Sequence, residues 1–280
     1  LIQPDSLITV YLSLSTPVNS DSDSEEIKEA TVELFINDEY SETLTKLSDG
    51  IYQSAQAAEI DKNYRLEATI VGYEPLRAST RIPQAPIITG GTYEQRAIYV
   101  HQQSDYKDIA ILNFIDPKNS VDYYQITFYD AFYKYIYETD PITGEATAVD
   151  STHYVSVTYH LDSSHPAIMN ENDIAFFPYR GATESLVFSD TLLQYENTMT
   201  FIITMSNTAL LRGVSKDYYL YEKSRIRQRA NLEILNYNPT NFFLVNNPVD
   251  LYSNVENGLG IFAGYSETHY ELEDITDYEF

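Results

Sequence analysis

Residues 122–138 read DYYQITFYDAFYKYIYE and indicate the fold class of the whole chain. Aromatic and β-branched residues recur in this stretch with a period of two, which is typical of a β-strand. Such side chains favour strands because they fit a pleated, half-buried surface. We therefore predict either one long strand here or a hairpin with a kink near Asp130.

The composition of the chain extends this preference beyond one segment. The 280 residues include 26 Tyr and 12 Phe but no Trp, and 43% of them are hydrophobic. This apolar content is enough to build cores, so we expect a globular protein rather than a disordered one. The length fits one large or two ordinary domains. We predict a mainly β protein.

The first 85 residues show repeated strand signals. Period-two alternation appears in residues 8–14, 30–36 and 64–70, and Asp49-Gly50 is typical of a tight hairpin turn. Short strands with turns about every 8–12 residues predict an antiparallel sandwich. We expect residues 1–85 to form a seven-strand-type sandwich of Ig-like or transthyretin-like kind.

A turn-rich junction that includes Pro83, Pro86 and Gly90 marks the predicted boundary between two domains. We expect residues 86–280 to form a larger β-sandwich or barrel-like domain that carries one α-helix at about residues 215–230. Ser215 is a suitable cap for this helix. Arg225 and Arg227 lie in its later turns, where cations favour the helix dipole.

The charge balance narrows the classes of partner. The chain has 42 acidic and 17 basic residues, a formal net charge of −25. This field repels phosphate backbones and anionic headgroups, so we expect no nucleic acid and no electrostatic docking on a membrane. The absence of Cys excludes disulfides, thiolate metal sites and cysteine nucleophiles. No apolar run is long enough to span a bilayer.

No catalytic or cofactor motif is evident, and we expect no enzyme activity, cofactor or metal. His153, His160 and His165 lie close in sequence, but His153 and His160 would point to opposite faces of a strand. Residues 19–26 read NSDSDSEE but lack the Gly and distal Glu of a calcium loop. A hydrolase that uses carboxylates or these histidines is the least favoured alternative.

Two sets of side chains are candidate contacts for a ligand or partner. The first set is aromatic, and its rings on a sheet would stack on sugars or peptides: Tyr123, Tyr129, Tyr133, Tyr135 and Tyr137. Alternating Tyr also packs well with no ligand present. The second set is Arg225 and Arg227, which either pair with acidic neighbours or form a partner-binding helix face.

Several motifs resemble a known family. They are SKDYYLY at residues 215–221, NPV at 247–249, IDP at 115–117, DYY at 122–124 and, most specific, SNVENGLGIF at 253–262. These segments resemble domain-of-unknown-function family 4249 of Bacteroidetes outer-membrane lipoproteins, with Asp122 where Asn is usual. Residues 30–32, 49–52, 64–66 and 72–73 resemble the transthyretin-like or carboxypeptidase-regulatory-like module that opens such proteins.

The resemblance implies a context and no catalytic residues. It implies a lipid-anchored protein of the outer membrane or cell surface, whose signal peptide and anchor would precede Leu1, and which assists a TonB-dependent nutrient-uptake receptor. The ligand would be a small molecule, peptide or glycan. A structural, adhesion or assembly module that binds another protein is the alternative. We expect a structural role for Asn254, Glu256, Asn257, Gly258 and Gly260, since Gly permits turns and close packing.

Overall fold

The computed structural model describes residues 1–15, 27–100, 105–116, 123–139, 146–155, 163–171, 185–203, 207–237 and 250–277. At residues 100, 105, 130–139, 146–155, 169–171 and 229–237 it describes the backbone alone. The chain divides into two compact units. Unit 1 contains residues 1–85 and 213–266, and unit 2 contains residues 86–212 and 267–280. The sequence predicts two domains, residues 1–85 and 86–280. That these stretches fold as separate domains stays a prediction.

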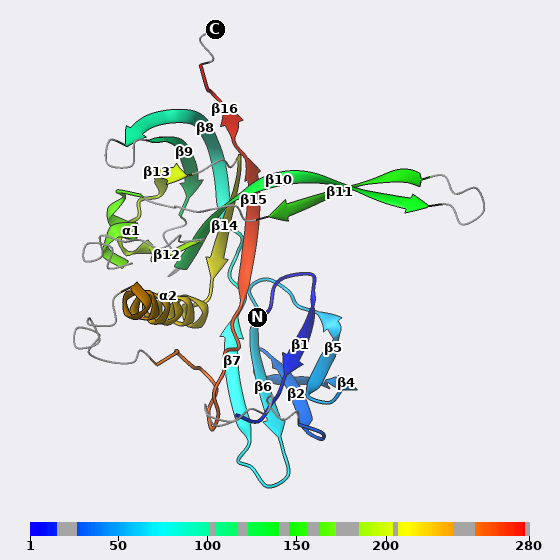
Figure 1. The fold of residues 1–280 in the computed structure, drawn as a ribbon. Helices are drawn as coiled ribbons and strands as arrows, with labels where there is room; N and C mark the ends of the chain where they lie inside the picture. Colours follow the sequence, from blue (N-terminus) through cyan, green and yellow to red (C-terminus); the bar gives the residue numbers. More distant parts are fainter. Residues whose placement is uncertain are drawn as a thin grey trace. The chain divides into compact units, whose positions relative to one another are not determined.

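The predicted mainly β class is confirmed, and the first 85 residues form seven strands in two antiparallel sheets (Figure 1). One sheet has the order β1-β5-β4, with β1 Leu7–Tyr11, β5 Ile51–Ala57 and β4 Thr45–Ser48. The other has the order β3-β2-β6-β7, with β3 Glu39–Thr43, β2 Thr31–Ile36, β6 Asn63–Thr69 and β7 Leu76–Arg81. The predicted seven-strand sandwich is therefore confirmed.

The period-two pattern of these strands builds the core of unit 1. Tyr64, Leu66 and Ala68 of β6 are buried at alternate positions. The ring of Tyr64 is buried while its hydroxyl accepts a hydrogen bond from the Glu59 N–H at 2.6 Å, so no polar group is stranded. Full burial of a Leu side chain such as Leu66 contributes roughly 1.5–3 kcal/mol, and the smaller Ala68 contributes less.

Four strands make the first sheet of unit 2, in the order β13-β9-β8-β16. They are β13 Glu196–Ile203, β9 Asp105–Ile115, β8 Ile87–Val100 and β16 Glu273–Asp274. β16 runs parallel to β8, whereas β9 is antiparallel to both β8 and β13.

A second sheet has the order β11-β10-β14-β15, and β12 also pairs with β10. Its strands are β11 Ala146–Val155, β10 Tyr123–Thr139, β14 Thr208–Val214, β15 Tyr265–Glu271 and β12 Leu186–Ser189. β10 is a single strand whose pairing with β11 starts at Asp130, so the predicted long strand is confirmed and the kinked hairpin is excluded.

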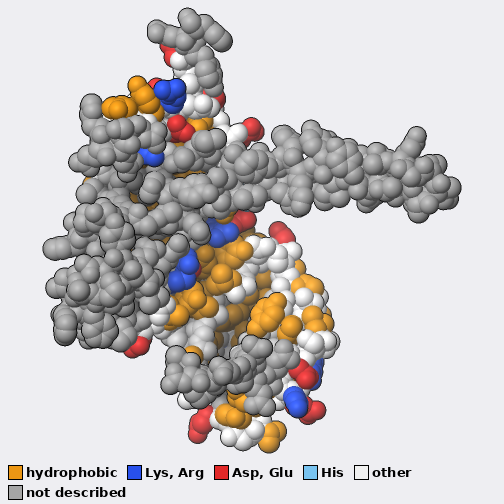
Figure 2. All heavy atoms as spheres, viewed as in Figure 1, with side chains coloured by type: hydrophobic (Ala, Val, Ile, Leu, Met, Phe, Trp, Pro, Cys, Tyr) orange, Lys and Arg blue, Asp and Glu red, His pale blue; other side chains and the backbone are white. Residues whose placement is uncertain are grey.

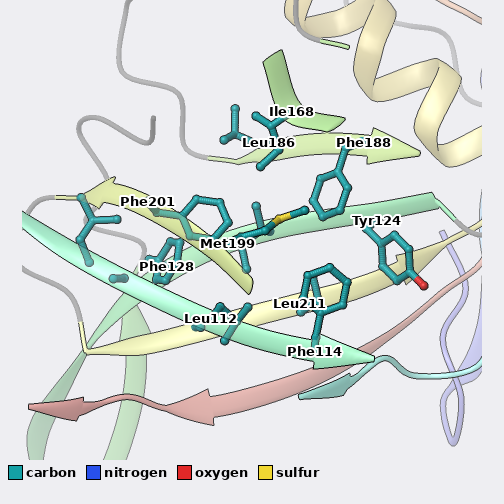
Figure 3. Packing of buried hydrophobic residues seen from close by; sticks show 14 of the residues in the cluster. Leu112, Phe114, Tyr124, Phe128, Ile168, Leu186, Phe188, Met199, Phe201 and Leu211 are labelled. Carbon is teal, nitrogen blue, oxygen red and sulfur yellow. The ribbon is translucent and has the colours of Figure 1, made fainter. Parts of the chain in front are cut away.

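The core of unit 2 lies between these sheets, where the two aromatic pairs Phe114–Tyr124 and Phe128–Phe201 join β9 to β10 and β10 to β13 (Figure 3). The ring centroids are 5.7 and 5.1 Å apart, within the range that favours aromatic pairs. The Tyr124 hydroxyl donates to a carboxylate oxygen of the buried Asp116 at 2.6 Å. Of the sandwich or barrel-like fold expected for residues 86–280, unit 2 shows two sheets around one core. The helix that was expected in the same domain, α2 (Lys216–Tyr237), belongs to unit 1.

The helices depart from expectation in two ways. Helix α2, Lys216–Tyr237, ends seven residues beyond the predicted residue 230. Apolar residues continue to Leu235 and a proline follows only at Pro239, so nothing in the sequence stops the helix earlier. Helix α1, Pro166–Glu171, and the 3₁₀ turn Asp190–Leu192 were not predicted, because elements this short carry little periodicity.

The end of the chain corrects another expectation. The sequence predicts that residues 259–265 return to a sheet, but β15 begins only at Tyr265. The amide side chain of Asn254 accepts from the Phe262 N–H at 2.9 Å and donates to the Phe262 carbonyl at 2.7 Å. A side chain therefore satisfies the backbone groups that a neighbouring strand would otherwise bind.

Candidate functional site

The β10–β11 ribbon is the most extended feature of unit 2. Ten consecutive pairs join the strands, from Asp130↔Val155 to Thr139↔Ala146, which corresponds to about 30 Å. Figure 1 shows β10 and β11 running away from the sandwich of unit 2 as two strands. β11 is the last strand in its sheet, so no strand in the described ranges pairs with its outer edge. Such an edge offers N–H and C=O groups to another strand.

The five candidate tyrosines are distributed along β10. Tyr123 and Tyr129 lie at the end of β10 that belongs to the sandwich, and both are half-buried. Burial raises the pKa of Tyr129. Tyr133, Tyr135 and Tyr137 occupy alternate positions in the ribbon, and their side chains lie outside the described part. Their contact with a ligand or partner stays a prediction.

A row of polar side chains crosses the second sheet of unit 2, and sequence reasoning did not find it. Arg212 of β14 donates to Glu267 of β15 at 2.8 Å and to the Gln125 amide oxygen of β10 at 3.0 Å. Gln125 in turn donates to the Ser185 hydroxyl at 3.1 Å, and both are buried. The partners are 87 and 55 residues from Arg212, so no local pattern could reveal them.

The charges and hydrogen bonds of this row favour a structural role over a catalytic one. Burial acts most strongly on Glu267 and raises its pKa, but hydrogen bonds from Arg212 and His269 outweigh it and leave the pKa below its usual value. A carboxylate held ionised in this way is a poor general acid near neutral pH. Its ion pair with Arg212 links two strands and orients the buried Gln125.

The helix α2 places the second candidate set on its exposed side. Ser215 caps the helix as predicted, with its hydroxyl 3.3 Å from the Tyr218 N–H. Arg225 donates twice to the buried Glu222, at 2.7 and 3.0 Å, and this hydrogen bonding raises the pKa of Arg225. Arg227 is exposed. Arg225 therefore neutralises a buried carboxylate, and a partner-binding role for Arg225 and Arg227 stays a prediction.

The terminal motif at residues 253–262 lies along the edge strand β7. Glu256 forms an isolated bridge with Arg77, with backbone hydrogen bonds of 2.8 and 3.4 Å. The Asn254 and Asn257 amides donate to backbone carbonyls of Ser79 and Pro75, at 3.2 and 2.9 Å. The motif therefore covers the edge of the four-stranded sheet of unit 1, much as an added strand would.

The glycines of this region permit close approach. A Cβ on Gly258 would lie 2.9 Å from the Leu76 side chain, and Gly260 has a φ of +151° that other residues rarely adopt. Gly264, which was not among the residues expected to have a structural role, is tighter still: a Cβ there would lie 2.4 Å from the Arg81 carbonyl oxygen. Its N–H also donates to the Thr80 hydroxyl at 3.0 Å.

An apolar tip accompanies the motif. Val71 and Tyr73 of the β6–β7 loop are exposed, as is Leu259 of the motif. The Asn257 side chain donates a hydrogen bond to the Pro75 carbonyl and so ties the motif to this loop. Figure 2 shows apolar side chains at the end of unit 1 where this loop lies. The described structure contains no group that covers them.

Among the histidines considered as metal ligands, His165 is the one whose side chain the structure describes. The His165 ring nitrogen Nδ1 accepts from the Ala167 N–H at 3.3 Å, and burial lowers the pKa of His165. The His153 side chain, His160 and residues 19–26 lie outside the described residues. Within the described residues no three His, Asp or Glu side chains gather as a metal site, and no helix is long and apolar enough to cross a membrane.

Comparison with known proteins supplies the family. The model of the domain of unknown function DUF4249 matches residues 1–271, which cover nearly all of the chain and include the terminal motif. No match to the chain is found among curated proteins or among solved structures. The chain belongs to the DUF4249 family.

Proposed function

We propose that this protein is a non-enzymatic, lipid-anchored accessory of the outer membrane or cell surface. It assists a TonB-dependent nutrient-uptake receptor by binding that receptor or its ligand. The seven-strand, two-sheet arrangement of unit 1 supports its assignment as a transthyretin-like module that presents the rest of the protein. Unit 2, which contains the β10–β11 ribbon, then carries the binding function.

The observation that carries this proposal is the β10–β11 ribbon. A two-stranded ribbon buries little of its own surface and is only marginally stable by itself. A ribbon of ten pairs is therefore costly unless it contacts something else. The edge of β11 gives a partner strand main-chain hydrogen bonds, and the tyrosines of β10 supply the residue type that dominates binding hot spots.

The proposal is tested by shortening the ribbon. Replacing residues 134–151 with Asn-Gly keeps the four pairs from Asp130↔Val155 to Tyr133↔Thr152 and closes them with a favoured hairpin turn. We expect this variant to keep its thermal unfolding temperature. We also expect it to co-purify at least about tenfold less of the TonB-dependent receptor, which corresponds to about 1.4 kcal/mol of binding energy.

The matched control addresses the helix face. Arg227→Glu reverses an exposed charge without touching the Arg225–Glu222 pair, and we expect it to leave receptor binding unchanged. If the shortened variant binds the receptor as well as the natural chain, the ribbon is not the contact. If Arg227→Glu abolishes binding instead, the result favours the alternative hypothesis, in which the protein is an assembly module that binds its partner through helix α2.

A further inference from the structure

Arg96 in β8 has a backbone conformation that its residue type rarely adopts. Its φ is +54°, in the left-handed region where a β-carbon clashes with the backbone. Asn and Asp tolerate this region better than other residues. The other described non-glycine residues with positive φ are all of these two types: Asp5, Asn37, Asp38, Asp61 and Asn257. Arg96 is therefore the exception that needs an explanation.

The conformation belongs to a β-bulge that a buried carboxylate holds in place. The register of β8 against β9 shifts between Glu94 and Ile98. Asp108 is only 8% exposed and accepts two hydrogen bonds, from the Arg96 N–H at 2.9 Å and from the Tyr93 hydroxyl at 2.8 Å. A β-bulge changes the direction in which the side chains of its strand point. Backbone strain that the surrounding structure maintains is concentrated at functional sites.

The Arg96 side chain, which belongs to this bulge, lies over the ring of Tyr106. The guanidinium carbon lies 4.4 Å from the ring centroid of Tyr106. Tyr106 is the cross-strand partner of Tyr99, and the two ring centroids are 4.9 Å apart. Both tyrosines stay accessible, with 43% of Tyr99 and 46% of Tyr106 exposed. Arg96 and the two tyrosines therefore lie together on the surface, near the end of the β8–β9 pair where Tyr99 faces Tyr106.

The charge of Arg96 is unusual for this protein. The chain carries a net charge of −25, yet Arg96 has no carboxylate partner among the side chains that the structure describes. Other arginines of the described part do pair with carboxylates, namely Arg65, Arg77, Arg81, Arg212 and Arg225. The guanidinium of Arg96 is stacked on the Tyr106 ring. Its N–H groups can therefore donate hydrogen bonds to an external anion.

We propose that Arg96, Tyr99 and Tyr106 bind a sugar ring that carries one carboxylate. The guanidinium fork matches the two oxygens of a carboxylate. The negative face of a tyrosine ring attracts the weakly positive C–H groups on one face of a pyranose. The strongly negative protein disfavours ligands of high negative charge, which favours a single carboxylate over a polyanion. The site lies on another strand pair than the ribbon and does not depend on it.

The test compares two ligands that differ in one group. Methyl β-D-glucuronide and methyl β-D-glucoside are titrated into the full chain, with binding followed by NMR. We expect the glucuronide to bind at least about tenfold more tightly, because it alone offers a carboxylate to the guanidinium fork. Equal affinity for the two sugars would overturn the proposal. Sodium acetate is the third ligand, and acetate binding as tight as that of the glucuronide would show a bare anion site and overturn the sugar assignment.

Variants separate the site from the overall charge. Arg96→Gln should lower the glucuronide affinity to that of the glucoside, whereas Lys28→Gln, which removes the same charge from an exposed position in unit 1, should not. Arg96→Gly provides a variant that relieves the backbone strain, so it should unfold at a higher temperature than Arg96→Ala and still fail to bind. Unchanged glucuronide binding by the folded Arg96→Gln or Arg96→Gly protein would refute the site.

Discussion

Gly264 is required for its lack of a side chain, because a neighbouring strand occupies the space where a β-carbon would lie. It lies beside β7, with its N–H bonded to the Thr80 hydroxyl, and a Cβ added to it would lie 2.4 Å from the Arg81 carbonyl oxygen. A neighbouring backbone moves less readily than the tip of a flexible side chain. The close approach therefore demands glycine for lack of space, whatever its dihedral angles.

We predict that Gly264→Ala lowers the free energy of unfolding by about 3 kcal/mol, since an added methyl group must displace backbone. The matched control is Gly72→Ala. Gly72 has a φ of +87° but no atom within 4 Å of its virtual Cβ, so this change should cost only about 1 kcal/mol of backbone strain. Urea unfolding of both variants measures the difference. Equal losses would show that space at Gly264 is not the limiting factor.

At the scale of elements, Tyr252 links the segment after α2 back to the start of that helix. Its N–H donates to the Ser224 hydroxyl at 2.9 Å, and its own hydroxyl donates to an Asp217 carboxylate oxygen at 2.6 Å. Burial, followed by the Asp217 carboxylate, raises the pKa of Tyr252 to about 12. The folded protein therefore holds this phenol protonated more firmly than the unfolded chain does.

This linkage predicts a dependence of stability on alkaline pH. A pKa that folding raises gives stability that is present below the unfolded value, about 10, and is lost as the pH rises towards 12. The natural chain should therefore lose its advantage over Tyr252→Phe between about pH 10 and 12. Because the group is only half-buried, we expect this loss to be about 1 kcal/mol. Urea unfolding at pH 8, 10 and 11 measures it, and a constant difference between the two proteins would contradict the linkage.

At the scale of the whole molecule, unit 1 is assembled from two distant stretches of chain. Phe262 is only 6% exposed and belongs to the core cluster built by the strands of residues 1–85. The predicted first domain therefore has a core that this stretch alone does not complete. Loss of a buried Phe side chain typically costs about 3–5 kcal/mol, which is a large part of the stability of a small domain.

We predict that a fragment of residues 1–85 is much less stable than unit 1 of the intact chain. Adding a peptide of residues 250–266 should raise its unfolding temperature, because a ligand that binds only the folded form stabilises it. The same peptide with Phe262→Ala is the control and should have little effect. A fragment that unfolds as late as the intact chain, with no response to the peptide, would show that residues 1–85 are a self-sufficient domain.

These examples also show what the sequence could predict. Alternation within residues 30–36 and 64–70, the cap at Ser215 and the long strand of residues 123–139 are local signals, and all of them correspond to observed elements. The edge covering of β7, the Arg212–Glu267 pair and the Asp108 contact with Arg96 depend on which strands become neighbours. A single sequence carries no local pattern for such pairings, since burial and register are set by the tertiary fold.

The covering of β7 has a consequence for the time course of synthesis. Thr80 and Gly264 are 184 residues apart, so a ribosome that adds about 5–20 residues per second needs about 10–40 s to make the second after the first. During that interval the emerging sandwich has an unpaired strand edge and a gap in its core. The protein therefore passes through a prolonged vulnerable stage, in which a holding chaperone would protect it better than a faster intrinsic folding rate would.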